Sequence, residues 1–355
     1  MKSRALLHQS GPGSAALKCL GLAVTFAASA LLSGAGYAQG AVSAAEWDRI
    51  VAAARKEGRV VAYVNSLPNV NDRLRDDFAK AYPGVVLEIN RIVGPPIGGR
   101  VEEERKSGVD GADLAITGES VFFLESAKQG LIKRPVGPSS VGWPEKFMLG
   151  GAAPALNMEP FIIVYNTNLV KFPVTGYMDL LRPEFKDGKV GTSEPVGPIL
   201  LAWYDFLEKL GGGGWVAKFA AQKPKLYIGV VPTTQSVASG ELMATALSMA
   251  STALPLLDKG APIKLVVPNP PVLNAYYGGV LGWAKRPNAA MLAMDYLMSV
   301  RGQTVWNGTG GQASALSGIP NSLDSRTLEL TDLRNYPNSA IGPYRDNWNR
   351  MFKAQ

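Results

Sequence analysis

The stretch SAAEWDRIVAAARKEGRVVAYVNSLPN, residues 43–69, holds a helix pattern, an apolar run and a polar turn in direct succession. Ser43 and Glu46 form the S-x-x-E capping box that is typical of a helix start. Apolar residues then recur at helical spacing until Gly58 ends the pattern. The apolar run at 60–64 predicts a strand, so this stretch predicts a helix and strand of an α/β fold, with polar residues at the carboxyl end of the strand.

Strand and helix patterns alternate along the rest of the chain. Further strands are expected at residues 85–89, 113–117, 161–165, 189–191, 226–230, 263–267 and 276–283. Helical patterns lie between most of them, and a late one covers 288–299. Alternation at this spacing predicts right-handed βαβ units and parallel sheets. Because the pattern restarts after a loop rich in glycine and proline, two α/β lobes are expected.

Residues 1–38 have the composition of a cleavable signal peptide. They carry three basic residues and no acidic one, and the apolar run at 19–32 is shorter than the ~20 residues that span a bilayer. The small residues Gly36 and Ala38 occupy the −3 and −1 positions of a cleavage site. We therefore expect a secreted, periplasmic protein without this segment.

The only cysteine, Cys19, and the only histidine, His8, lie in this segment. The exported chain then has no disulfide, no Ser-His-Asp triad and no thiol nucleophile. A secreted hydrolase that uses paired carboxylates is the enzyme class left open. Lipidation of Cys19 is the alternative to cleavage, although Lys18 stands where a lipidation signal needs a small residue.

The charge of the exported chain argues against a nucleic-acid partner. Without residues 1–38, 33 basic residues face 29 acidic ones, which gives a net charge of +4. This excess is too small and too scattered for a nucleic-acid interface. A chain of roughly 317 residues is also too long for one simple core, which again favours two domains.

Six segments resemble, in order, those of extracellular solute-binding proteins of ABC importers, in the branch that binds ferric iron, thiamine and phosphonates. They are EWDRIVAAARKEGRVVAYVNSLPN (46–69), FAKAYPGVVLEINRIVG (78–94), ADLAITGES (112–120), PFIIVYNTNLV (160–170), TTQSVASGE (233–241) and PNAAMLAMDYLMSVRGQ (287–303). The resemblance implies a two-lobed periplasmic binding protein fold (type 2), with mainly parallel sheets flanked by helices, joined by crossing strands and closing on a ligand. It also implies a monomer that is not an enzyme, with a small-molecule ligand, an inner-membrane ABC permease as partner, and no cofactor.

The resemblance further implies a discontinuous division into lobes. Lobe 1 is expected to comprise residues 39–159 and 267–302, and lobe 2 residues 160–266 and 303–355. A sequential division with one break near residue 155 is the alternative. We prefer the discontinuous division because residues 288–303 are similar to the segment that returns to the first lobe in such proteins.

The ligand of an open parallel sheet binds beyond the carboxyl ends of the strands, where helix N-termini converge. Five junctions rich in Ser, Thr, Asn or Gly are expected there, at residues 66–69, 91–99, 117–120, 192–197 and 232–236. The expected ligand-binding residues are Ser66, Asn69, Arg91, Thr117, Ser193, Thr233, Thr234 and Tyr276. Free N–H groups, the helix dipole and a guanidinium favour a small, anionic organic solute. Taken singly, each junction is also compatible with an ordinary N-cap.

The pair Tyr276-Tyr277 is similar to the adjacent tyrosines of ferric-binding members. The resemblance, however, places such a pair in the segment that residues 246–250 occupy here, which has no tyrosine. We therefore expect no metal ligands and assign Tyr276 to the wall of the cleft. Ferric iron, thiamine and polyamines remain alternative ligands, and a signalling receptor remains an alternative partner.

Overall fold

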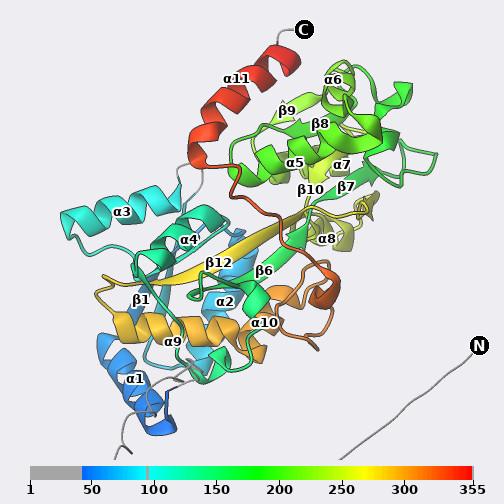
Figure 1. The fold of residues 1–355 in the computed structure, drawn as a ribbon. Helices are drawn as coiled ribbons and strands as arrows, with labels where there is room; N and C mark the ends of the chain where they lie inside the picture. Colours follow the sequence, from blue (N-terminus) through cyan, green and yellow to red (C-terminus); the bar gives the residue numbers. More distant parts are fainter. Residues whose placement is uncertain (1–41, 93–95, 354–355) are drawn as a thin grey trace, which may run out of the picture. The chain divides into compact units, whose positions relative to one another are not determined.

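The computed structural model describes residues 42–92 and 96–353. The expected signal peptide at 1–38, with Cys19 and His8, lies outside the described residues. The described residues form one compact unit with two sheets (Figure 1). Within the described ranges, no helix is long and apolar enough to cross a membrane.

The first sheet has seven strands in the order β2-β1-β3-β12-β6-β5, with β4 paired to β12. Their bounds are β1 (Arg59–Val64), β2 (Val86–Arg91), β3 (Leu114–Thr117), β4 (Ile132–Lys133), β5 (Met148–Leu149), β6 (Ala153–Pro160) and β12 (Leu273–Leu281). Residues 60–64 of β1 are buried, as the apolar run predicts.

Six helices accompany the first sheet. They are α1 (Ala44–Glu57), α2 (Pro68–Ala81), α3 (Ile97–Ser107), α4 (Ser120–Lys128), α9 (Pro287–Met298) and α10 (Val300–Asn307). The predicted start and end of α1 are confirmed: the Ser43 side chain accepts a hydrogen bond from the Glu46 N–H, and Gly58 follows with φ 71°. A left-handed residue at this place favours glycine. Helix α9 packs on β1, β6 and β12, and α10 packs on α2 and β6.

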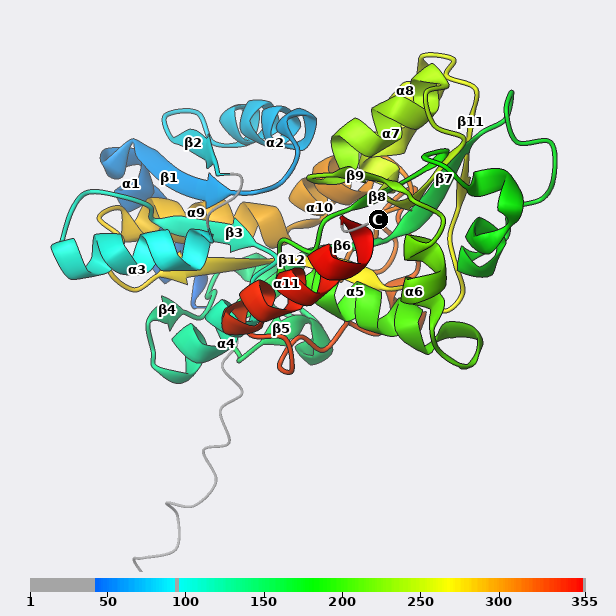
Figure 2. The same cartoon turned by 90° about the horizontal axis from the view of Figure 1, so that it is seen from above.

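The second sheet has five strands in the order β11-β7-β10-β8-β9. Its strands and helices are β7 (Ile162–Asn166), β8 (Val190–Ser193), α5 (Pro198–Lys209), α6 (Trp215–Ala220), β9 (Lys225–Tyr227), α7 (Val230–Ser239), β10 (Ala244–Ser248), α8 (Ala250–Asp258), β11 (Ile263–Val266) and α11 (Ile341–Phe352). Helix α7 packs on β7, β8 and β10, whereas α5, α6 and α11 pack on one another (Figure 2). Short 3₁₀ helices in the connections are η1 (Pro138–Ser140), η2 (Glu145–Phe147), η3 (Tyr177–Leu181), η4 (Pro183–Phe185), η5 (Leu210–Gly212), η6 (Ser325–Thr327) and η7 (Asn338–Ala340).

Both sheets are mixed, which corrects the expectation of mainly parallel sheets. Strands β2-β1-β3 and β10-β8-β9 are parallel, but the remaining pairs are antiparallel. The chain passes from β6 into β7 through Phe161 and returns between β11 and β12. Because the two passages run in opposite directions, β6 pairs antiparallel with β12, and β7 with β11. The predicted crossing strands are therefore present.

The C-terminal part of the chain contributes to the cores of both sheets. Trp306 and Ala313 belong to the core around the first sheet, while Trp348 and Phe352 belong to the core around the second. The expected assignment of 303–355 to lobe 2 places all four residues in one lobe. We propose instead that lobe 1 extends through α10 and that α11 belongs to lobe 2.

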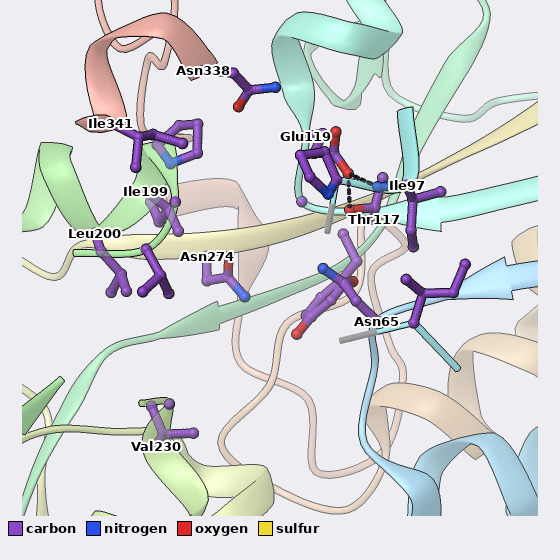
Figure 3. A pocket seen from close by; sticks show the side chains of 18 of the residues that line it. Asn65, Ile97, Thr117, Glu119, Ile199, Leu200, Val230, Asn274, Asn338 and Ile341 are labelled. Carbon is purple, nitrogen blue, oxygen red and sulfur yellow. Dashed lines mark hydrogen bonds between the residues drawn. The ribbon is translucent and has the colours of Figure 1, made fainter. Parts of the chain in front are cut away.

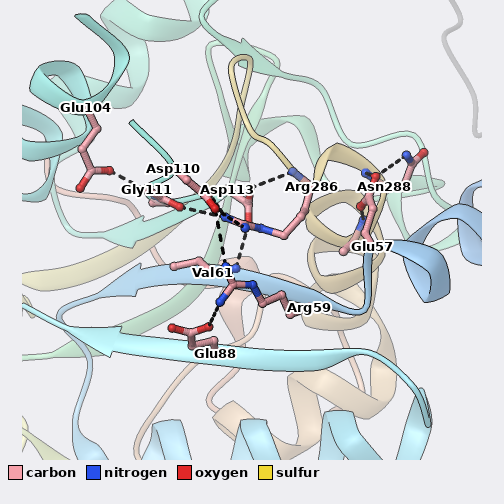
Figure 4. A network of polar contacts seen from close by, with 12 residues as sticks. Glu57, Arg59, Val61, Glu88, Glu104, Asp110, Gly111, Asp113, Arg286 and Asn288 are labelled. Carbon is pink, nitrogen blue, oxygen red and sulfur yellow. Dashed lines mark hydrogen bonds and ion pairs between the residues drawn. The ribbon is translucent and has the colours of Figure 1, made fainter. Parts of the chain in front are cut away.

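A buried ion pair joins the start of α9 to the first sheet. The Asp113 carboxylate is inaccessible to solvent and accepts hydrogen bonds from the Val61 N–H and from Arg286 Nε, at 2.9 and 2.6 Å. Arg286 also contacts both carboxylate oxygens of Asp110 (Figure 4). The network therefore connects β1, the start of β3 and the residue before α9.

Candidate functional site

Two adjoining cavities lie between residues of the two sheets. The first has a volume of about 310 Å³ and mostly apolar walls, and we call it the apolar cavity. The second has a volume of about 240 Å³ and contains more polar side chains, and we call it the polar cavity. Five residues line both cavities: Asn65, Arg91, Gly229, Val230 and Tyr276.

Arg91 is the last residue of β2 and lies beside the turn that follows β1. The parallel register pairs it with Val64, so the two strands end together. Its Nε donates a hydrogen bond to the Ser66 carbonyl oxygen at 2.8 Å, which fixes the stem of the guanidinium. Arg91 forms no ion pair with any carboxylate in the part of the chain that the structure describes. A cation without a counter-ion thus lines both cavities.

Two helices of the second sheet begin at the cavity walls. Gly197 and Pro198 start α5, and Gly229 and Val230 start α7. Among the described residues, no side chain caps either N-terminus with a hydrogen bond. The first N–H groups of a helix have no partner within the helix, and the helix dipole is positive there. Both ends therefore favour a negatively charged group in the cavity.

Glu119 occupies the N-terminus of α3 in the wall of the apolar cavity. Its Oε1 accepts hydrogen bonds from the Ile97 N–H at 2.8 Å and from the Thr117 hydroxyl at 3.2 Å (Figure 3). Its carboxylate also accepts from the Gly98 N–H. Burial raises the pKa of Glu119 against these hydrogen bonds, which lower it. This helix terminus is thus satisfied by the chain itself.

Glu159 likewise accepts hydrogen bonds at the N-terminus of α8, in the wall of the polar cavity. It lies near the end of β6 and accepts hydrogen bonds from the Ser251 N–H and hydroxyl, at 2.6 and 2.9 Å. Gln312 adds a third donor at 3.3 Å. Burial raises the pKa of Glu159 to about 7. Carboxylates of the chain therefore occupy the N-termini of α3 and α8, whereas those of α5 and α7 have none.

The two adjacent tyrosines of β12 face different surroundings. Tyr276 lines both cavities, whereas Tyr277 packs near Phe123 and lines a separate hollow with Leu330. Successive strand residues point to opposite faces of a sheet, which explains the separation. Burial raises the pKa of each hydroxyl to about 12. The two phenols therefore do not converge on one ion.

Four of the eight predicted site residues line the two cavities: Ser66, Arg91, Thr117 and Tyr276. Asn69 lines a neighbouring hollow that it shares with Ser251, a wall residue of the polar cavity. Ser193 is buried at the end of β8 and is not in either cavity wall. The structure brings the first four together and places Asn69 and Ser193 apart from them.

Thr233 and Thr234 lie inside α7, so the expected junction at 232–236, predicted as a polar turn ahead of a helix, is wrong. Both are inaccessible to solvent, and their hydroxyls donate to the carbonyl oxygens of Gly229 and Val230, at 3.1 and 2.7 Å. Neither threonine lines either cavity. The residues of this segment that line the cavities, Gly229 and Val230, lie one turn earlier.

The sequence-based prediction did not include Glu119, Asn157 or Glu159. Glu119 lies within a predicted junction, at 117–120, and its position directly after a predicted strand could have identified it as a site residue. Asn157 and Glu159 lie in β6, which was not predicted as a strand. Their partners, Asn307 and Ser251, are distant in sequence and carry no local signal.

Two lobes joined by crossing strands, with cavities between them, define a two-lobed binding protein. The family described as bacterial extracellular solute-binding protein matches residues 59–311. The chain belongs to this family, which confirms the predicted two-lobed α/β fold and the predicted class of extracellular solute-binding proteins. No curated protein matches the chain significantly.

Solved structures of similar fold include three with informative titles. The substrate-binding protein of an ABC transporter from Agrobacterium tumefaciens is 17% identical, with a TM-score of 0.72 over 84% of this chain and 96% of that one. AfuA from Actinobacillus pleuropneumoniae, with exogenous fructose-6-phosphate bound, is 18% identical, with a TM-score of 0.67 over 84% and 100%. Iron-bound HitA from Pseudomonas aeruginosa is 16% identical, with a TM-score of 0.62 over 83% and 98%.

Proposed function

We propose that this chain is the periplasmic solute-binding component of an ABC transporter and captures a small, anionic organic solute between its lobes. The observation that carries the proposal is Arg91, a cation in both cavity walls without a carboxylate partner among the described residues. The protein then acts as a monomer, is not an enzyme, and delivers its ligand to an inner-membrane permease. The similarity to an ABC transporter component supports this partner.

The proposed ligand contacts follow from the charges around the cavities. Arg91 and the N-termini of α5 and α7 would hold the anionic group, because the carboxylates of Glu119 and Glu159 already satisfy two other helices. Thr117, Tyr276 and Ser66 would complete the walls. AfuA, solved with a sugar phosphate, supports an anionic organic ligand for this fold.

A thermal-shift screen tests the class of ligand. The panel contains phosphate esters, phosphonates and organic acids, together with thiamine, polyamines and ferric citrate. A ligand at a hundredfold excess over its Kd stabilises the folded state by about 2.7 kcal/mol, so the Tm should rise with organic anions. A rise with thiamine or polyamines alone would contradict an anionic ligand, and hydrolysis of a chromogenic ester would contradict a pure binding protein.

Arg91→Met should weaken the binding of the best anion by roughly ten- to a hundredfold, because a hydrogen bond to a charged group contributes about 1.5–3 kcal/mol. Arg91→Lys keeps the charge without the guanidinium geometry and should bind with intermediate affinity. Arg75→Met, on the exposed face of α2, is the matched control. Calorimetric titration measures all three, and parental affinity in Arg91→Met would overturn the proposed contact.

Ferric iron should not bind with high affinity. The hydroxyls of Tyr276 and Tyr277 lie on opposite faces of β12, so they cannot supply two phenolates to one ion. The protein mixed with ferric citrate should show no visible phenolate-to-iron absorption band. A band that disappears in Tyr276→Phe would show that this tyrosine binds iron with other ligands.

A further inference from the structure

A chain of three side-chain amides lies behind the polar cavity. Gln303 donates through Nε2 to the carbonyl oxygens of Leu156 and Leu297, at 3.0 and 2.7 Å. Of the two terminal atoms of a glutamine side chain, only the nitrogen can donate a hydrogen bond to a carbonyl oxygen. The orientation of the Gln303 amide is therefore fixed. Its Oε1 must then be an acceptor, and it accepts from Asn307 Nδ2 at 2.9 Å.

The orientation of the Gln303 amide determines that of the Asn307 amide, which in turn determines that of Asn157. Asn307 Nδ2 also donates to the Leu156 carbonyl oxygen at 3.0 Å, so Asn307 Oδ1 is left as an acceptor. Asn157 Nδ2 donates to this oxygen at 2.6 Å. The nitrogen of Asn157 is therefore held toward α10, and its oxygen is directed away from that contact.

Asn157 is inaccessible to solvent and lines the polar cavity. Its Oδ1 has no hydrogen-bond partner within the described ranges. Glu159 lies two residues along β6, on the same face of the strand, and its carboxylate also accepts hydrogen bonds. This wall of the cavity thus presents acceptor oxygens, and a buried acceptor without a partner is costly.

We propose that the polar cavity binds a hydroxyl group of the ligand, which donates a hydrogen bond to Asn157 Oδ1. This inference rests on the proposed function and narrows it to hydroxylated organic anions, such as polyol phosphates or hydroxy acids. Arg91 lines the same cavity and repels an ammonium group, so a neutral donor is favoured over a cationic one. The Glu159 oxygens already accept from Ser251 and Gln312. Two amide oxygens of residues that line this cavity, Asn157 Oδ1 and Asn65 Oδ1, have no partner among the described residues, and the amide chain fixes the orientation of Asn157.

The test compares matched anions with and without hydroxyl groups by calorimetric titration of the exported chain. The pairs are glycerol 3-phosphate with propyl phosphate, gluconate with hexanoate, and tartrate with succinate. A further compound, 3-aminopropyl phosphate, carries an ammonium group in place of a hydroxyl and tests the preference for a neutral donor. The hydroxylated member of at least one pair should bind roughly ten- to a hundredfold more tightly than its deoxy partner. Asn157→Leu should bring this ratio close to one, because only the hydroxylated member loses a hydrogen bond to Oδ1.

Different failures identify different errors. Equal binding of both members by the parent protein, or an unchanged ratio in Asn157→Leu, overturns the role of Asn157 and leaves the anionic ligand in place. Tighter binding of 3-aminopropyl phosphate overturns the preference for a neutral donor. If none of the anions binds, the proposed function fails and the inference fails with it. Should Asn157→Leu not fold, Asn307→Leu frees the Asn157 amide to rotate, and a reduced ratio in this variant supports the proposal whereas an unchanged one overturns it.

Discussion

Replacement of Arg286 by methionine should lower the free energy of unfolding by about 3–5 kcal/mol, the usual effect of removing one partner of a buried ion pair. Asp113, the residue before β3, has no solvent access, and Arg286 gives it both a guanidinium hydrogen bond at 2.6 Å and a backbone N–H hydrogen bond at 3.0 Å. Without the guanidinium, the carboxylate keeps backbone donors but has lost its buried counter-ion (Figure 4).

Urea denaturation of the parent and of Arg286→Met measures this effect. Arg334→Met is the matched control, because its ion pair with Asp332 is exposed, with 74% and 51% of the two side chains accessible. Exposed pairs contribute at most about 1 kcal/mol. Asp113→Asn combined with Arg286→Met removes the uncompensated charge and should recover part of the loss. Equal destabilisation by the two single Arg→Met variants would show that burial of the pair is unimportant.

The sequence was most informative where local pattern and tertiary packing agree. The helix and strand of the opening stretch were predicted because their caps and apolar residues are local: Ser43 and Gly58 bound α1, and β1 is buried. A strand at 85–89 was predicted for the same reason, and in the structure β2 extends to Arg91, which lines the cavity. A cavity residue close to the end of a predicted strand is therefore predictable from sequence.

The segment 232–236 was misread because proline and threonine were interpreted as turn residues. Pro232 is the third residue of α7, and proline is tolerated in the first turn of a helix because N–H groups there have no intrahelical partner. The hydroxyls of Thr233 and Thr234 donate hydrogen bonds to the carbonyl oxygens four residues earlier in the helix. Composition alone does not distinguish this helix start from a turn.

Strand β6 was missed because its sequence, APALNMEP, contains polar residues and two prolines. Its buried polar side chains find partners far along the chain: Asn157 pairs with Asn307, and Glu159 with Ser251. Hydrogen bonds between residues so far apart in the chain leave no periodic pattern in the sequence. The polar cavity was unpredictable for this reason, although half of the predicted site residues reached the cavity walls.

Glu159 should make the stability of the protein depend on pH between about pH 4.5 and about pH 7. Burial raises its pKa from 4.5 to about 7, so the folded state favours the protonated form. A raised carboxyl pKa contributes stability that is fully present below the unfolded value and is lost as the pH rises through the folded value. The loss amounts to about 3 kcal/mol for a shift of this size.

Glu159→Gln keeps the shape of the side chain and an acceptor for the Ser251 N–H, but it does not titrate. The variant should therefore lack this part of the pH dependence and gain stability over the parent as the pH rises from about 5 to about 8. Chemical denaturation at both pH values measures the difference, with Glu103→Gln on the exposed face of α3 as the control. A difference between parent and variant that does not change with pH would show that Glu159 is ionised in the folded state throughout this range.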